Sequence, residues 1–277
     1  MIKIVTDSTA DIPREYVNKY DITVLPLNIN IDGKTYQDGI NISPAEVCDY
    51  MQKGKIPKTS QVPPIEFYNT FEKLTRNGDE VIAIIMSSQL SSTYNAALLS
   101  SKQLPDRKIA VLDSMGVSLG QGLQVIEAAR MALAGKVFKD IIKRVKALSK
   151  KMNYAIIINT LEYVFKGGRI SKVQYIAANL LHLNLVCSSD GTGKIIVADK
   201  FRGKEKSILR WTAKHIARLK ITNKTVGLNA INNNEKLLQE VKALIQKYNP
   251  KEIIESQIGS TVACYAGPNA IGIYAEE

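Results

Sequence analysis

The fold is decided by three short stretches of the same design. They are Lys3-Ile-Val-Thr-Asp-Ser8, Val81-Ile-Ala-Ile-Ile-Met-Ser-Ser88 and Lys108-Ile-Ala-Val-Leu-Asp-Ser114. Each contains a short apolar run without a polar face, which is typical of a buried strand in a parallel sheet. Each ends in hydroxyl or acidic residues and then enters a predicted helix. Because ligands of open α/β sheets bind beyond the carboxyl ends of the strands, we expect a site for a small anionic group there.

The order of strands and helices predicts two domains of an α/β protein. Strand and helix patterns alternate up to Lys151, which predicts an N-terminal α/β domain with a parallel sheet over residues 1–151. The following strands are short and separated by turns, such as 185–188 and 194–200 on either side of Asp190-Gly191. Residues 152–277 are therefore predicted to form a C-terminal α+β domain with a mixed or antiparallel sheet.

Five local predictions accompany this division. We expect one strand over 22–29, followed by a hairpin at Asp32-Gly33, and a helix near Pro13 capped by Asp11. We expect Thr59-Ser60-Gln61 in a loop, and a helix Val173–Leu183 capped by Ser171. The apolar stripe of that helix either lines a tunnel or packs as an ordinary core face; its members are Val173, Ile176, Ala177, Leu180 and Leu181.

Composition excludes several classes of protein. The chain has 277 residues, 45% of them hydrophobic, and a net charge of +11. No apolar run approaches the ~18 residues of a membrane span, and the charged N-terminus does not resemble a signal peptide. The basic excess fits an acidic partner, transient contact with a membrane surface, or simply a solvated helical face. Aromatic residues are few and not interleaved with arginine, which argues against nucleic acid.

The cysteines and histidines argue against a metal site. Cys48, Cys187 and Cys264 are isolated from one another, which is typical of a protein in the reducing cytoplasm. Two histidines are too few to favour a His-built metal site or a Ser-His-Asp triad. Gly116, Gly120 and Gly122 lack the order of a phosphate-binding loop, so no nucleotide cofactor is expected.

Two groups of hydroxyl residues are candidates for binding an anion. Ser91-Ser92-Thr93 precedes a helix and supplies more hydroxyls than a helix cap needs. Thr59 lies between prolines, where it either donates to a carboxylate or phosphate or forms an ordinary turn. Asp7 and Asp113 either cap helices or act as bases, so a hydrolase or phosphotransferase with Ser91 as nucleophile remains the alternative.

Two further segments combine small residues with a functional group. Lys166-Gly-Gly-Arg-Ile-Ser171 joins two helical pieces through a tight turn, where Arg169 pairs on the surface or points at a carboxylate or a partner. Ile258-Gly-Ser-Thr-Val-Ala-Cys-Tyr-Ala-Gly-Pro268-Asn-Ala270 leaves room for a ligand to approach the backbone, or is a tight junction between elements.

Taken in order along the chain, these motifs resemble the DegV family of bacterial lipid-binding proteins. The resemblance covers the whole chain and rests on six motifs: Thr6–Pro13, Thr59–Gln61, Ser87–Tyr94, Asp113-Ser114, Lys166–Ile170 and Gly267-Pro268. It implies two domains of the EDD fold enclosing a long-chain fatty acid such as palmitate, stearate or oleate. It also implies a subunit without catalysis of its own, which presents the fatty acid to a separate fatty acid kinase that makes acyl phosphate from ATP.

The resemblance also implies roles for individual residues. Thr59 and Ser91 would hold the carboxylate with Ser92 and Thr93 beside them, and Arg169 would lie at the mouth, near the headgroup or the kinase. Arg202 resembles a kinase-docking residue. The chain departs from the family pattern at Ser92, which replaces a glycine, at Asn269, also in place of a glycine, and at Tyr265, in place of a histidine. A tyrosine hydroxyl can donate to the carboxylate, as a histidine does, but it stays neutral.

Overall fold

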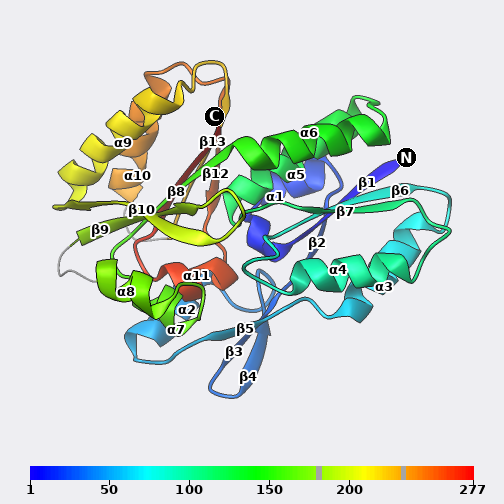
Figure 1. Cartoon of the computed structure of the whole chain (residues 1–277), viewed down its shortest axis with the longest axis horizontal. Coiled ribbons are helices and arrows are strands. Elements are labelled where there is room, and N and C mark those ends of the chain that lie inside the picture. The colour runs from blue at the N-terminus through cyan, green and yellow to red at the C-terminus, as the bar shows by residue number, and fades with distance from the viewer. Residues whose placement is uncertain (179–182, 232–234) are drawn as a thin grey trace.

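The computed structural model describes residues 1–178, 183–231 and 235–277 of the chain. Within these ranges the strands form three sheets, and helices lie between and outside them (Figure 1). The first is a parallel sheet in the order β2-β1-β6-β7, as the three opening stretches predict. Its strands are β1 (Ile2–Asp7), β2 (Thr23–Leu25), β6 (Glu80–Ile85) and β7 (Ile109–Asp113).

Helices cover both faces of the parallel sheet, because successive residues of each strand point to opposite faces. In β6, Ile82 and Ile84 pack toward one pair of helices, whereas Val81, Ala83 and Ile85 pack toward the other. The first pair is α5 (Leu119–Leu133) and α6 (Phe138–Lys151), and the second is α3 (Pro64–Thr75) and α4 (Thr93–Lys102).

The second sheet confirms the predicted mixed sheet in the C-terminal half. Its order is β10-β9-β8-β13-β11-β12, in which β11 and β12 are parallel and the other pairs antiparallel. The strands are β8 (Met152–Ile158), β9 (Leu183–Ser189), β10 (Ile195–Arg202), β11 (Thr225–Ala230), β12 (Glu252–Gln257) and β13 (Ile271–Glu276).

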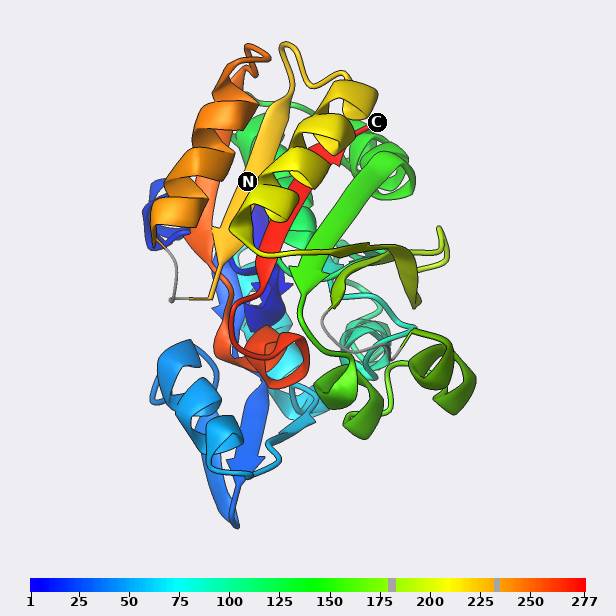
Figure 2. The same ribbon diagram turned by 90° about the vertical axis from the view of Figure 1, so that its left-hand side faces the viewer.

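Helix α5 lies between the two large sheets and is buried on both sides. Val125 and Ala128 pack against the parallel sheet, whereas Leu119 and Leu123 pack with residues of the mixed sheet. On the other face of the mixed sheet, α9 (Glu205–Leu219) and α10 (Glu235–Gln246) lie side by side (Figure 2). The shared helix therefore joins the two halves through apolar packing.

The third sheet is small and antiparallel, and it packs against the C-terminal half. Its order is β4-β3-β5, and it projects from the rest of the molecule (Figure 2). Ile29 of β3 and Val47 of the following helix share a core with Ile158 and Val262 of the C-terminal half. The elements are β3 (Asn28–Ile31), β4 (Lys34–Gln37), β5 (Lys58–Ser60), α2 (Pro44–Gln52), α7 (Glu162–Lys166) and α11 (Ser260–Ala266).

Two local predictions in the N-terminal half are wrong. The single strand expected over 22–29 is two strands in two different sheets, and Pro26 lies in the gap between them. Thr59 and Ser60 lie not in a loop but in β5, where Thr59 pairs with Ile29. The hairpin predicted at Asp32-Gly33 is confirmed, because β3 pairs antiparallel with β4.

Two predicted features of helices are also wrong. Asp11 does not cap α1 (Arg14–Lys19), whose N-cap is Pro13, but takes a left-handed conformation after the short helix η1 (Ser8–Ala10). The helix expected over Val173–Leu183 is α8 (Lys172–Ala178), and Leu183 already belongs to β9. Val173 and Ile176 are 77% and 64% exposed, so neither is a core residue. The side chain of Ala177, and Leu180 and Leu181, lie outside the described residues.

The predicted boundary between residues 151 and 152 falls where α6 ends and β8 begins. This boundary remains a prediction, since the apolar core of the small sheet includes residues from both sides of it.

Candidate functional site

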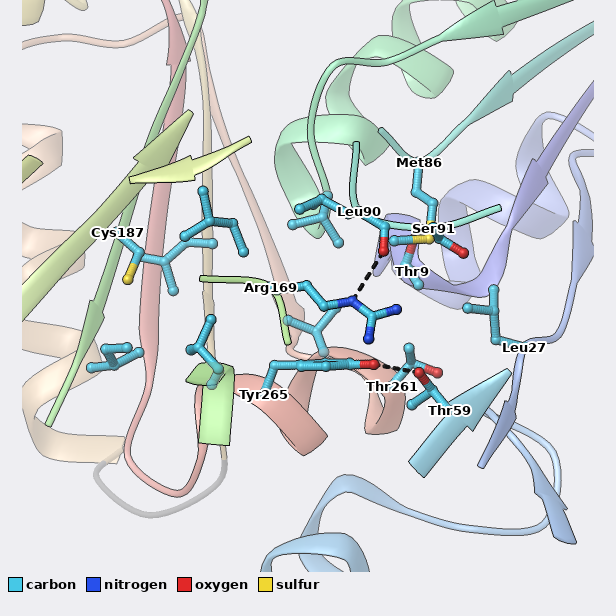
Figure 3. A pocket seen from close by; sticks show the side chains of 17 residues that line it. Thr9, Leu27, Thr59, Met86, Leu90, Ser91, Arg169, Cys187, Thr261 and Tyr265 are labelled. Carbon is cyan, nitrogen blue, oxygen red and sulfur yellow. Dashed lines mark hydrogen bonds between the residues drawn. The ribbon is translucent and has the colours of Figure 1, made fainter. Parts of the chain in front are cut away.

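A mostly apolar cavity lies where the small sheet, the loop after β6 and helix α11 meet the mixed sheet (Figure 3). The empty space between the atoms of its walls, counted together with open solvent at its mouth, is about 650 Å³. Polar groups gather at one end, around Thr59, Ser91 and Tyr265, and Cys187 lies at the other end (Figure 3). The apolar walls are formed by Leu27, Met86, Leu90, Val117, Ile156, Ile158, Val164, Ile195, Val262 and Ala266.

The polar end brings together three of the residues singled out in the sequence. The Thr59 and Tyr265 hydroxyls share a hydrogen bond of 2.5 Å, although 206 residues separate them in the chain. Ser91 reaches the same cavity from the loop after β6 (Figure 3). Its hydroxyl accepts a hydrogen bond from the Thr93 amide at 3.2 Å. The three hydroxyls thus meet at one place, although Thr59 belongs to β5, Ser91 to a loop and Tyr265 to helix α11.

Arg169 supplies the positive charge of this end. Its guanidinium lies over the Tyr265 ring, 4.9 Å from Cζ to the centroid (Figure 3). Nε donates to the carbonyl of Leu90 at 3.0 Å, and Nη1 donates to that of Gly167 at 2.6 Å. Nη2 has no hydrogen-bond partner among the residues that the structure describes. The guanidinium is therefore fixed in place and keeps N–H groups available for an anion.

The turn before Arg169 depends on its two glycines. Gly168 has a φ of +75°, which glycine adopts without strain. A Cβ on Gly167 would lie 2.3 Å from Cε1 of Tyr265, so only glycine lets that ring pack so closely. The Gly-Gly pair therefore positions both Arg169 and Tyr265.

Two buried carboxylates from the N-terminal half hold the start of α11. Asp11 accepts a hydrogen bond from the Gly259 amide, and Asp38 accepts one from the Ser260 amide, both at 3.0 Å. Burial raises the pKa of both carboxyl groups, that of Asp11 well above its ordinary value. These bonds fix the helix that carries Tyr265.

The whole chain is similar to known proteins. The model of the DegV family, a family described as uncharacterised proteins, matches residues 1–277. The chain belongs to the DegV family. A DegV domain-containing protein of Caldanaerobacter subterraneus subsp. tengcongensis is 36% identical over 278 residues, covering 100% of this chain and 99% of the relative.

Two solved structures are close to this chain in fold. A DegV family protein from Thermus thermophilus, described by its fatty acid binding, has a TM-score of 0.91 and 26% identity, over 100% of this chain and 99% of the other. A stearic-acid-binding protein from Eubacterium ventriosum has a TM-score of 0.89 and 26% identity, over 100% and 98% of the two chains.

The other residues named from the DegV resemblance lie outside the cavity wall. Thr93 is fully buried, and its hydroxyl shares a hydrogen bond of 2.9 Å with that of Ser91. It therefore orients the Ser91 hydroxyl without lining the cavity itself. Ser92 is exposed and does not line the cavity. Arg202 is exposed at the end of β10, also away from the cavity wall.

Two hydroxyls of the polar end were not predicted from the sequence. Thr9 follows β1 and lines the cavity, although its hydroxyl also donates to Asp7 at 2.5 Å. Thr261 lies on α11 beside Thr59 (Figure 3), and its buried hydroxyl makes no hydrogen bond of normal geometry among the described residues. It is nevertheless near enough to Asp38 to favour the charged form of that carboxylate. The excess of hydroxyls at the carboxyl ends of the strands was the signal for Thr9; Thr261 had none.

Asp7 and Asp113, the bases of the alternative hydrolase or phosphotransferase, bind backbone amides instead of Ser91. Asp7 accepts a hydrogen bond from the Met86 amide at 2.8 Å, and Asp113 accepts one from the Met115 amide at 2.7 Å. In the described part of the chain, neither is bonded to Ser91, which pairs with Thr93 instead. Both carboxylates thus order the loops that follow the strands.

The glycines after β7 serve packing. A Cβ on Gly116 or Gly120 would lie 1.9 Å or 2.2 Å from atoms of the Tyr154 side chain. Among residues 1–178, 183–231 and 235–277, no group of His, Cys, Asp or Glu side chains could hold a metal ion. In the same ranges no helix is long and apolar enough to cross a membrane.

Proposed function

We propose that this DegV protein binds a long-chain fatty acid such as palmitate, stearate or oleate in the cavity. The supporting observation is an apolar cavity with neutral hydroxyls and one fixed guanidinium at a single end. The carboxylate lies between Thr59, Ser91 and Tyr265 and faces Nη2 of Arg169. The similar structures described as binding fatty acids, a DegV family protein and a stearic-acid-binding protein, support the same ligand class.

The energetics of the cavity suit this ligand. Burying a methylene contributes about 0.8 kcal/mol, so a chain of roughly fifteen carbons gains ~12 kcal/mol before the cost of immobilisation. A carboxylate without hydrogen-bond donors would cancel much of that gain. The hydroxyls and the guanidinium provide these donors, and a charge-assisted bond to arginine is stronger than a neutral one.

Binding to the Tyr265→Phe variant tests the carboxylate site. We expect the affinity for stearate to fall roughly tenfold to a hundredfold, because a hydrogen bond to a charged group contributes roughly 1.5–3 kcal/mol. Isothermal titration of the delipidated protein measures it. Methyl stearate is the control ligand: it carries no charge, so its weaker binding should change much less. Equal losses for both ligands would place the carboxylate elsewhere, and a wild-type protein that takes up no fatty acid would refute the proposed function.

We further propose that the protein is a carrier in the cytoplasm and presents the carboxylate to a separate fatty acid kinase, with no catalysis or cofactor of its own. Arg202 belongs to an exposed basic run that also contains Lys200, Lys204 and Lys206, and such a surface fits an acidic partner. The same positive charge favours transient contact with an anionic membrane surface.

The Arg202→Ala variant tests the docking role. Stearate affinity should stay unchanged, since Arg202 does not line the cavity. The rate of acyl phosphate formation with the kinase and ATP should fall several-fold, with half-saturation shifted to higher carrier concentration. Lys139→Ala, an exposed cation on α6, is the matched control. Equal rates for both variants would remove Arg202 from the interface.

A further inference from the structure

A second chamber continues the lipid cavity away from its polar end. It has a volume of about 330 Å³, counted with adjoining open space. The two spaces have five wall residues in common, so they meet along a shared boundary. These shared residues are Leu90, Val117, Ile156, Cys187 and Ile195.

Strand β8 gives the direction of the combined channel. Alternate residues of a strand lie on the same face. Ile158 lines only the first cavity, Ile156 lines both, and Tyr154 lines only the second. The channel therefore runs along one face of β8, and from Ile158 to Tyr154 it covers about 13 Å.

Tyr154 closes the far end as a rigid wall. It is 4% exposed, and its ring packs edge-on against Tyr274 with the centroids 6.0 Å apart. Gln124 donates a hydrogen bond to its hydroxyl at 3.1 Å. Gly116 and Gly120 approach so closely that a Cβ on either would collide with the side chain. The position of the wall is thus set by Tyr274 together with residues of the N-terminal half.

The turn between β9 and β10 forms one side of the far chamber. The hydroxyl of Ser87 donates to the carbonyl of Gly193 at 2.8 Å. A Cβ on Gly193 would lie 2.2 Å from the Ser87 hydroxyl, so the turn sits directly on the loop after β6. Ile195 follows this turn and lines both spaces.

We propose that this far chamber binds the methyl end of the acyl chain and that Tyr154 sets the longest chain the protein accepts. The inference rests on the proposed function and adds chain-length selection to it. An acyl chain anchored at Thr59 and Ser91 passes Ile158 and Ile156 and ends against Tyr154. A chain too long for this path leaves methylenes in water and loses their burial.

Matched substitutions on neighbouring residues of β10 test this. Ile195→Phe adds bulk inside the channel, whereas Ile196, the next residue on the opposite face, lines neither space. Native mass spectrometry with an equimolar mixture of decanoate, palmitate, stearate and arachidate reads out the selection. For Ile195→Phe we expect stearate occupancy relative to decanoate to fall about tenfold or more. Ile196→Phe should keep the wild-type profile.

A second pair of variants distinguishes a filled channel from a misfolded protein. Cys187→Phe fills the same boundary from β9, and Cys187→Ala is its control. Circular dichroism establishes that each variant folds. A folded channel variant with an unchanged chain-length profile overturns the inference while leaving fatty acid binding intact. A wild-type protein that binds none of the four acids overturns the proposed function itself.

Discussion

Tyr265 and Arg169 divide between them the tasks of donating a hydrogen bond and of supplying charge. The DegV resemblance implies a histidine at the position of Tyr265, and a histidine can do both. Here the Tyr265 hydroxyl lies 2.5 Å from that of Thr59, and the charge comes from the guanidinium stacked on the ring. The pair therefore offers a carboxylate both a hydrogen bond and a positive charge.

The buried side chain of His215 should make the folded protein less stable in acid. Burial, with the nearby Arg218, lowers its pKa to about 4, whereas an unfolded histidine titrates near 6.5. Between these values the unfolded chain takes up a proton that the folded protein refuses, so stability falls as the pH falls through this window. The full effect is roughly 3 kcal/mol.

The His215→Phe variant isolates this effect. Phenylalanine keeps an aromatic ring to stack on Trp211, whose centroid lies 4.6 Å from that of His215, but it cannot take up a proton. The difference in melting temperature between pH 7 and pH 4.5 should be smaller in the variant than in the wild type. Equal differences would mean that His215 is accessible to protons in the folded state.

A substitution in the turn between α7 and α8 should weaken stearate binding without unfolding the protein. In Gly167→Ala, the new methyl group must displace the Tyr265 ring, because it would lie 2.3 Å from Cε1. Stearate affinity should fall several-fold, since Thr59 then loses its partner and Arg169 loses the ring beneath it. Gly135→Ala serves as a stability control: its φ of +73° is unfavourable to alanine, unlike the φ of −76° at Gly167, but no atom lies within 4 Å of the new methyl group. Equal binding by both variants would show that the ring position does not matter.

Some elements could be predicted from sequence and others could not. The three opening stretches predict β1, β6 and β7, because an apolar run on both faces of a strand requires layers of helices above and below it. Thr59 was misplaced in a loop: its strand has three residues, and only pairing with Ile29 makes it one. The short hydroxyl motifs carry no information on such distant pairing.

The residues of the candidate site, too, could be predicted from the sequence only where a local motif marks them. Ser91 and Arg169 could be singled out locally, by an excess of hydroxyls and by a Gly-Gly turn. Thr261 could not, because a lone threonine in a small-residue segment has no distinguishing neighbour. Gly116 and Gly120 resembled part of a poor phosphate loop, and their packing against Tyr154 depends on a strand that begins more than thirty residues later.

At the scale of the whole molecule, the two halves should unfold together. Helix α5 is buried between both large sheets, and two bidentate ion pairs add contacts across the halves. These are Arg130 with Glu252 and Arg144 with Glu276. Trp211 is the single tryptophan and lies in the C-terminal half, so its fluorescence reports on that half.

We therefore expect one urea transition, with the same midpoint by Trp211 fluorescence and by far-ultraviolet circular dichroism. Saturating stearate should move both midpoints upward together, because the ligand binds only the folded protein. Two separate midpoints would show that the halves are stable independently and that the packing of α5 does not couple them.

The most direct measurement is a crystal structure of the delipidated protein after incubation with stearate. The account predicts one unbranched stretch of electron density that begins between Thr59, Ser91 and Arg169, runs past Ile156 and ends against Tyr154. Density for the acyl chain elsewhere on the protein, or a channel closed by its own side chains at saturating stearate, would contradict it.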